Sequence, residues 1–286
     1  MELSGYSYSF AYAIERGEID TAGTIRFHAE LGIRANELTD SFINDDDIPE
    51  IMAALAETGS TVSCYDVYSS FVEPDGAPSP ADLGRVQKGL DRAATLGARR
   101  VLIVPSETNP NVPPERIRQH YAEVIKSALP AARRLGLTLM TANLGSAAAI
   151  NGKVDHLKEV IAITGPEVKV TYDVGNYVMA AEDTIAALDQ VAPLMEHVHL
   201  KDWTIKQPGS ATPVPGGFPA TDGSYYYSEP LGDGVVPLPE AIGRLRGLGY
   251  TGYLSVEYEG QADPKAALRK GVTYLRTLLD PAPAAG

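Results

Sequence analysis

Three potential metal ligands stand at or near the ends of three apolar runs in the second half of the chain. Asp173 ends the run VKVTYD, His199 lies in HVHLKD, and Glu257 lies in LSVEYEG. Two carboxylates and an imidazole form a mixed oxygen and nitrogen donor set, which suits Mn²⁺, Mg²⁺, Co²⁺ or Zn²⁺. Each has an ordinary explanation alone, because an aspartate often caps a helix and a histidine often bonds within a core. Together they predict a cation site, provided that the three runs are neighbouring strands.

Other polar side chains accompany these ligands. Lys201 shares a strand face with His199, since side chains alternate along a strand, and it either meets a substrate oxygen or pairs with a carboxylate. His197 lies on the same face, but deeper, and we expect it to be structural. Asn176 follows Asp173 by three positions and either holds a substrate hydroxyl or caps a helix.

Acidic residues also follow earlier apolar runs. Glu37, Asp66 and Glu107 could line the same pocket, although helix capping is the simpler interpretation of each. We count Glu107 among the candidates for substrate binding, together with Asn143, which lies close to the end of the run 137–145.

The elements that must position these residues alternate regularly along the chain. Apolar runs typical of strands are followed by helical patterns, and the helix-to-strand joints repeat one phrase: ELGI, ETGS, TLGA, RLGL and GLGY. Glycine suits the left-handed position after a helix. Such alternation requires parallel strands, and eight units close as a (β/α)8 TIM barrel of the α/β class. No glycine-rich phosphate loop follows the first strand, which disfavours an open doubly wound sheet. The predicted strands are residues 3–12, 33–39, 61–68, 98–106, 137–145, 168–174, 197–202 and 252–260.

Residues 1–280 are therefore expected to form one barrel domain, with a flexible tail at 281–286. Residues 203–236 form a long insert, rich in proline and glycine, which contains Tyr225, Tyr226 and Tyr227. A connection of this length in a compact domain is usually functional. We expect a lid-like loop whose tyrosines, Tyr226 among them, offer flat surfaces to a sugar ring or an aromatic group. A subunit contact is the alternative.

Composition narrows the class of protein. The formal net charge of −13 disfavours nucleic acid and anionic membranes as partners, since both require basic surfaces. The single cysteine, Cys64, excludes an intramolecular disulfide and a cysteine-cluster zinc site, and we expect it to be buried. No basic leader with an apolar run and no 18-residue apolar stretch is present, so we expect a cytoplasmic protein. A homo-oligomer that acts on a small molecule is the expectation.

The motifs YDVGN, HVHLKDW, GDG and VEYEG resemble those of the sugar phosphate isomerase/epimerase superfamily of xylose isomerase-like barrels. The resemblance covers nearly the whole chain and is most specific at strands six, seven and eight. It implies a divalent cation, with manganese the first choice, held by Glu, Asp, His and Glu from strands five to eight. Asp173, His199 and Glu257 match three of these ligands. The implied activity is isomerisation or epimerisation of a sugar, keto-sugar or polyol by proton transfer beside a carbonyl, with Glu257 as a base.

The fourth ligand is missing, because Ala142 in TANLG stands where members of this superfamily tend to have the glutamate of LENHG. A methyl group can neither bind a metal nor move a proton. Three accounts remain open: a deliberate replacement of a natural glutamate, a natural site with weaker metal binding and one-base chemistry, or loss of catalysis. The intact remainder of the site, Asn143 included, favours a single replacement.

Two further functions stay open beside the isomerase. One is a lyase that eliminates from a 3-keto-glycoside, as C-glycoside-cleaving members of the superfamily do, and the other is a non-catalytic partner subunit. Endonuclease IV-like DNA repair shares the fold, but the acidic charge and the missing extra His and Asp ligands disfavour it.

Overall fold

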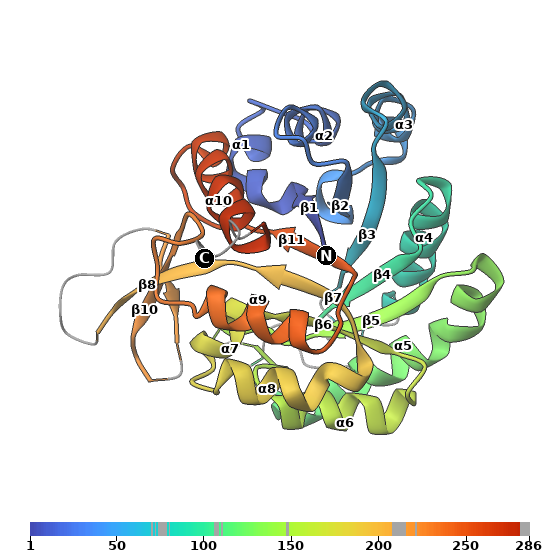
Figure 1. Ribbon diagram of the computed structural model, residues 1–286. Coiled ribbons are helices and arrows are strands. Elements are labelled where there is room, and N and C mark those ends of the chain that lie inside the picture. The colour runs from blue at the N-terminus through green and yellow to red at the C-terminus, as the bar shows by residue number, and fades with distance from the viewer. Residues whose placement is uncertain are drawn as a thin grey trace.

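The barrel is closed by eight parallel strands, in the order β1-β11-β7-β6-β5-β4-β3-β2 (Figure 1). The computed structural model describes residues 1–69, 71, 73, 79, 81–105, 109, 111–146, 149–207, 216–220 and 222–280. The tail at 281–286 lies outside these residues. The predicted (β/α)8 fold is thus confirmed. The barrel strands are β1 (Glu2–Tyr6), β2 (Ala35–Thr39), β3 (Thr61–Tyr68), β4 (Arg100–Val104), β5 (Thr138–Ala142), β6 (Lys169–Asp173), β7 (Met195–Leu200) and β11 (Tyr253–Val256).

Helices surround the barrel and bury its outer face (Figure 1). Asp20 begins one of them by accepting a hydrogen bond from the backbone N–H of Gly23, and Gly59 and Gly136 end two others at φ 63° and 68°. The α-helices are α1 (Ala11–Glu15), α2 (Thr21–Glu30), α3 (Ile48–Thr58), α4 (Asp82–Thr95), α5 (Pro114–Leu135), α6 (Val154–Thr164), α7 (Val174–Met179), α8 (Thr184–Val191), α9 (Leu238–Gly247) and α10 (Pro264–Leu279), and short 3-10 turns lie at Ser7–Phe10, Asp40–Phe42, Asp45–Asp47 and Ala192–Leu194.

The first strand is shorter than predicted. It ends at Tyr6, and the chain then turns through η1 (Ser7–Phe10) into α1 instead of continuing as a strand to residue 12. Two hydroxyls explain the turn, because the Oγ of Ser7 accepts from the N–H of Thr39 at 3.2 Å and the Oγ of Ser9 accepts from that of Tyr258 at 3.0 Å. Side-chain bonds to neighbouring strand ends compete here with further strand pairing.

Side chains alternate between the two faces of each barrel strand. In β4, Val101 and Ile103 pack outward in the layer between strands and helices, whereas Leu102 and Val104 point inward with Met140 of β5. The outward rows of β6, β7 and β11 are likewise apolar. The inward rows of these three strands are polar: Thr171 and Asp173, His197 and His199, and Ser255 followed by Glu257. The interior of the barrel therefore concentrates titratable groups near one end.

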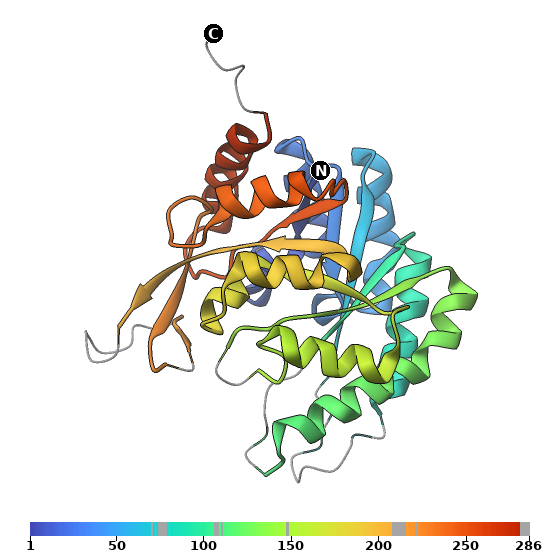
Figure 2. The same cartoon turned by 60° about the horizontal axis from the view of Figure 1, so that its bottom comes forward.

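The insert contains regular structure where it is described. β8 (Asp202–Lys206), β10 (Tyr225–Glu229) and β9 (Phe218–Pro219) form an antiparallel sheet in the order β8-β10-β9, which extends away from the barrel beyond β7 (Figure 2). Where the sequence suggested a loop, β10 pairs with β8 over five residue pairs. The insert is thus a small sheet continuous with the carboxyl end of β7.

Asp202 ties this insert to the barrel. Its buried carboxylate accepts hydrogen bonds from four backbone N–H groups, those of Trp203, Gly232, Gly234 and Val236, at 2.9 to 3.0 Å. A Cβ at Gly234 would lie 2.2 Å from the carboxylate oxygen, so only glycine fits this turn. The GDG motif is therefore explained by the shape of the turn around Asp202.

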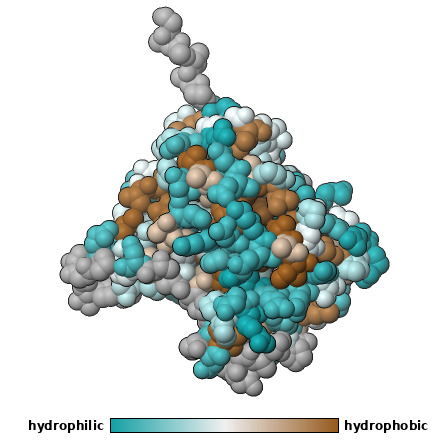
Figure 3. All heavy atoms as spheres, turned by 90° about the horizontal axis from the view of Figure 1, so that it is seen from below, coloured by the Kyte–Doolittle hydropathy of each residue, from teal (hydrophilic) through white to brown (hydrophobic). Residues whose placement is uncertain are grey.

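The surface mixes polar and apolar side chains. On the face seen in Figure 3, hydrophilic residues lie between the hydrophobic ones. Large exposed apolar residues occur singly, such as Met52 at 48% and Val235 at 53% exposure. Within the described ranges, none of the helices has the length and apolar character needed to cross a membrane.

Candidate active site at the barrel mouth

The three predicted ligands meet at the carboxyl ends of β6, β7 and β11. Asp173, His199 and Glu257 are buried, and one ligand atom from each lies within 4.8 Å of the others. The Nδ1 atom of His199 lies 3.7 Å from Oδ2 of Asp173 and 3.5 Å from Oε2 of Glu257. Their strands are neighbours in the order β6-β7-β11, so the barrel itself brings the three side chains together.

Lys201 enters the same group. Its Nζ lies 3.0 Å from Oδ2 of Asp173, 3.0 Å from Oε2 of Glu257 and 2.6 Å from Oε1 of Glu259. Burial lowers the pKa of Lys201, but the three carboxylates outweigh burial and raise it well above its usual value. The lysine is therefore a buried ammonium held by three carboxylates. Sequence reasoning missed Glu259, although its spacing of two from Glu257 places both on one strand face.

Asp173 is held rigidly by two asparagines. The amide of Asn143 pairs with the backbone of Asp173 twice, since Oδ1 accepts from its N–H and Nδ2 donates to its C=O, each at 3.0 Å. Asn176 donates its backbone N–H to Oδ1 of Asp173 at 2.9 Å and its side-chain amide to Oδ2 at 2.8 Å. Asn143 was named as a candidate for substrate binding, and Asn176 for substrate binding or helix capping. In the structure the amides of both residues position Asp173, and Asn176 also lines the cavity described below.

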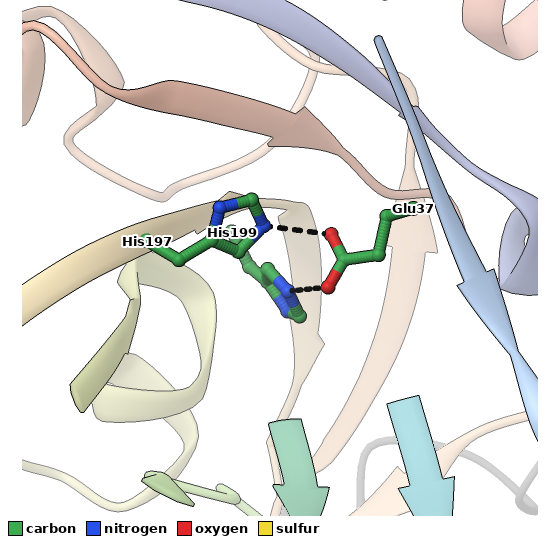
Figure 4. A group of neighbouring side chains, drawn as sticks. All are labelled: Glu37, His197 and His199. Atoms are coloured by element: carbon green, nitrogen blue, oxygen red, sulfur yellow. Dashed lines mark hydrogen bonds and ion pairs between the residues drawn. The ribbon is translucent and has the colours of Figure 1, made fainter. Parts of the chain in front are cut away.

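Glu37 joins two histidines from across the barrel (Figure 4). Its Oε2 accepts from Nε2–H of His197 and its Oε1 accepts from Nε2–H of His199, both at 2.9 Å. Helix capping, the simpler interpretation of Glu37, is wrong, because alternation in β2 turns this side chain into the barrel, where it is fully buried. His199 thereby points Nδ1 at Asp173 and Glu257.

The charges in this group are mutually dependent. Burial raises the pKa of Glu37, but His199 and His197 outweigh it and hold that pKa well below its usual range. Burial lowers the pKa of His199, while Glu37 and Asp173 raise it well above its usual value. The surrounding carboxylates favour a proton on His199, so a cation at Nδ1 would compete with that proton.

Asp66 lies beneath the mouth and caps no helix. The hydroxyl of Tyr6 donates to its Oδ2, and the thiol of Cys64 donates to its Oδ1 at 3.3 Å. Burial, and then the nearby charge of Glu37, raise the pKa of Asp66 well above its usual value. Asp66 and Cys64 point inward from β3 for the same reason that Glu37 does from β2. Neither contacts the cavity at the mouth, so both belong to the polar interior under the site.

Glu257 is the third of these predicted ligands, and its carboxyl is buried. Its Oε2 is buried and lies 3.0 Å from Nζ of Lys201 and 3.5 Å from Nδ1 of His199, but neither contact has the geometry of a hydrogen bond. Burial, partly offset by Lys201, raises its pKa to about 8. A carboxylate oxygen beside an aspartate oxygen and an imidazole nitrogen fits the donor set of a divalent cation. The residues present therefore fit such an ion with three protein ligands.

Ala142 closes β5 and points into the barrel. It packs with four inward-facing residues, Cys64, Leu102, Val104 and Met140, and is paired in register with Thr171 of β6. The strand-five corner of the site thus presents a methyl group in an apolar setting. Of the candidate substrate ligands, Glu107 lies outside the described residues.

A cavity of about 340 Å³ adjoins this group through Asn176 and Glu259. Aromatic side chains form its walls: Tyr8 and Tyr68 stack at 6.1 Å, and Trp203 meets Phe218 edge-on at 5.5 Å. Glu259 and Asn176 contribute polar atoms, and no lysine or arginine is among the described lining residues.

Tyr226 has a different place from the one expected. Its ring packs against Trp203 at 6.4 Å, and its hydroxyl donates to the C=O of Val178 at 3.2 Å. The side chain is only 4% exposed, so it supports the wall formed by Trp203 and does not face the cavity.

Comparisons with known proteins agree with this architecture. A family model described as a xylose isomerase-like TIM barrel matches residues 25–278. No curated protein sequence matches the chain. Among solved structures, the IolI protein with a bound zinc atom has a TM-score of 0.76 and 13% identity over 98% of both chains. The 3-keto-D-glucoside 4-epimerase YcjR of E. coli has a TM-score of 0.68 and 17% identity over 90% of this chain and 94% of its own. The probable 3-DHS dehydratase AsbF of Bacillus anthracis has a TM-score of 0.72 and 15% identity over 96% and 98%. At these identities the likeness establishes the fold.

Proposed function

This chain belongs to the family of xylose isomerase-like TIM barrels, and we propose that it is a metal-dependent isomerase of a sugar, keto-sugar or polyol. The observation that carries the proposal is the carboxyl of Glu257. It is buried at the mouth beside Asp173 and His199, its Oε2 is paired with Nζ of Lys201 at 3.0 Å, and burial raises its pKa to about 8. A base with a pKa near the working pH is best suited to proton transfer.

Asp173, His199 and Glu257 would hold the divalent cation. When bound, the ion would polarise a carbonyl and an adjacent hydroxyl of the substrate. The zinc atom bound to the similar IolI protein makes zinc as reasonable a first choice as manganese. Asn143 and Asn176 keep Asp173 in place, and Glu37 keeps Nδ1 of His199 directed at the site.

The single base favours isomerisation over epimerisation. Glu257 can remove a proton from the hydroxyl-bearing carbon beside a carbonyl and return it to the carbonyl carbon on the same face, while the hydroxyl proton passes to the former carbonyl oxygen. Epimerisation requires a proton donor on the opposite face of the substrate, and the corner on β5 offers only the methyl group of Ala142. One-base transfer is therefore the reaction that the described residues support.

Elimination is the second candidate, for the same reason. Removal of a proton beside a carbonyl is also the first step when a substituent leaves from the next carbon, and it too needs only one base. The aromatic walls of the cavity, Tyr8 and Tyr68 on one side and Trp203 and Phe218 on the other, favour a substrate with a flat or apolar substituent. The absence of basic side chains among the described lining residues favours an uncharged sugar over a phosphosugar.

Exchange of substrate hydrogen for deuterium in D₂O tests the proposal. A panel of sugars and keto-sugars would be incubated with Zn²⁺ or Mn²⁺, and exchange would be followed by NMR for the wild type and for Glu257→Gln. Glu196→Gln is the matched control, because Glu196 lies at the start of β7, away from the mouth, and pairs with Arg100.

We expect exchange in the wild type and the control and its loss in Glu257→Gln. Exchange without net conversion would show that the proton-transfer site works and that the panel lacks the true substrate. Equal exchange in Glu257→Gln, or none in the wild type with any substrate, would contradict the proposal and favour a non-catalytic binding role.

A further inference from the structure

The ammonium of Lys201 occupies a corner of the group of side chains that would hold the cation. We propose that Lys201 is an internal counter-ion that neutralises this group in the ion-free protein and must turn to Glu259 before a divalent cation can bind. This inference rests on the cation site of the proposed function, but its test below measures binding and not catalysis.

Two carboxylate oxygens lie close both to the imidazole of His199 and to the ammonium of Lys201. Oδ2 of Asp173 and Oε2 of Glu257 are the atoms nearest to Nδ1 of His199, at 3.7 and 3.5 Å. The same two oxygens each lie 3.0 Å from Nζ of Lys201. A four-coordinate zinc ion with bonds of about 2.0–2.2 Å has roughly 3.3–3.6 Å between its ligand atoms. The four atoms thus outline the space of one small cation, and Nζ stands at one corner of it.

The strand-five corner adds no charge to this group, because Ala142 presents a methyl group there. The buried carboxyl groups of Asp173 and Glu257 are instead paired with the ammonium of Lys201, without an external ion. A divalent cation and an ammonium cannot share two carboxylate oxygens in a buried site, because their repulsion is weakly screened there. Binding of an ion must therefore displace Nζ.

Glu259 provides the place to which Lys201 can turn. Its Oε1 already lies 2.6 Å from Nζ, and its carboxylate lines the cavity at the mouth, where solvent reaches it. The backbone N–H of Glu259 donates to Oγ of Ser228 at 2.8 Å, which fixes this residue against β10. A rotation about the lysine side chain therefore exchanges three carboxylate partners for one without leaving the charge unpaired.

The protein contains its own reporter for this movement. Trp203 is the only tryptophan of the chain, and Nζ of Lys201 lies 5.8 Å from the centre of its ring. A cation near an indole changes its emission, so zinc binding should shift Trp203 fluorescence in the wild type. The shift should be largely lost when residue 201 carries no charge.

Zinc titrations, by calorimetry and by Trp203 fluorescence, test the inference in four proteins: the wild type, Lys201→Met, Glu259→Gln and the double variant. We expect Lys201→Met to bind zinc about 10- to 100-fold more tightly and Glu259→Gln to bind it several-fold more weakly. In the double variant the effect of Glu259→Gln on zinc affinity should disappear, because Glu259 acts through the lysine. A direct electrostatic effect of the Glu259 carboxylate on the ion would instead persist in the double variant.

Lys206→Met is the matched control. It removes the same charge from β8, where Nζ lies over the ring of Tyr227 at 4.5 Å, and it should leave zinc affinity within about twofold. If Lys201→Met does not fold, as judged by circular dichroism, Lys201→Gln and the fluorescence titration of the wild type carry the same test. An affinity that is unchanged or weaker in the neutral variant would overturn the inference and identify Lys201 as support for the ion.

The two proposals fail separately. Tighter zinc binding by Lys201→Met without hydrogen exchange in any protein would leave the counter-ion role standing and remove the isomerase. Exchange that depends on Glu257, combined with weaker zinc binding by Lys201→Met, would do the reverse.

Discussion

Glu37→Gln tests most directly how Glu37 holds the imidazole of His199 in place. The carboxylate accepts from Nε2–H of both His197 and His199, whereas a glutamine has one acceptor and one donor group to offer. Nδ1 of His197 has no hydrogen-bond partner among the described residues, so His197 can change tautomer and accept from the new amide. His199 then keeps its acceptor but loses the charge opposite it.

The magnitude follows from these contacts. A hydrogen bond to a charged group contributes about 1.5–3 kcal/mol, and breaking a fully buried pair costs about 3–5 kcal/mol. Because one acceptor survives in Glu37→Gln, we expect the lower end, a loss of about 3 kcal/mol in the free energy of unfolding. Zinc affinity should fall about 10-fold, as is usual when the outer partner of a ligating histidine is weakened.

Urea unfolding followed by circular dichroism, together with zinc titration, measures both effects. Glu196→Gln is the control, because Glu196 pairs with Arg100 at 2.9 Å but its side chain is 35% exposed. A pair of this kind contributes no more than about 1 kcal/mol. If Glu37→Gln were no more destabilising than Glu196→Gln, and bound zinc as the wild type does, Glu37 would not be the brace of His199.

Three further predictions concern other parts of the chain. Asp202→Ala removes the acceptor of four backbone N–H groups, so we expect a loss of about 3 kcal/mol in urea unfolding and faster proteolysis within residues 203–236; unchanged proteolysis would contradict the anchoring role. Burial lowers the pKa of His28 from 6.5 to about 4, so the unfolded chain protonates first as the pH falls. The contribution of neutral, buried His28 to the free energy of unfolding is fully present above pH 6.5 and is lost between pH 6.5 and 4, by up to about 3 kcal/mol. In urea unfolding at different pH values, His28→Gln should flatten this part of the stability profile. Ala142→Glu should raise zinc affinity at least about 10-fold if a natural glutamate has been replaced at this position, and no gain in calorimetry would rule that account out.

The barrel and the convergence of the inward rows could be predicted because both depend on local patterns. Glycines mark five of the helix-to-strand joints, and the period of two in a strand places His199 and Lys201 on one face. Once β6, β7 and β11 are neighbours, Asp173 and Glu257 must come close to His199. Nothing beyond strand order is required for that conclusion.

Glu37 could not be placed in the same way, because its partners come from across the barrel. Its bond to His199 joins residues 162 positions apart, and no local pattern encodes that distance. The alternation in β2 did contain a signal, since apolar Leu38 faces outward and its neighbour must then face inward. Tyr8 was not predicted as a cavity residue for another reason. The hydroxyls of Ser7 and Ser9 end β1 early, and the turn that follows places Tyr8 at the cavity.

The motifs YDVGN and HVHLKDW belong together because they fit each other sterically. Gly175 of the first lies against the second: a Cβ at this position would be 2.3 Å from Cγ of Lys201 and 2.7 Å from Nε1 of Trp203. The C=O of Gly175 accepts from that Nε1 at 3.2 Å. The backbone after Asp173 therefore packs against the side chain of Lys201 and fixes the indole of Trp203 at the wall of the cavity. Any residue larger than glycine would push Lys201 away from Asp173 and Glu257. The glycine is therefore required by the position of the ammonium and by the fit of the indole beside it.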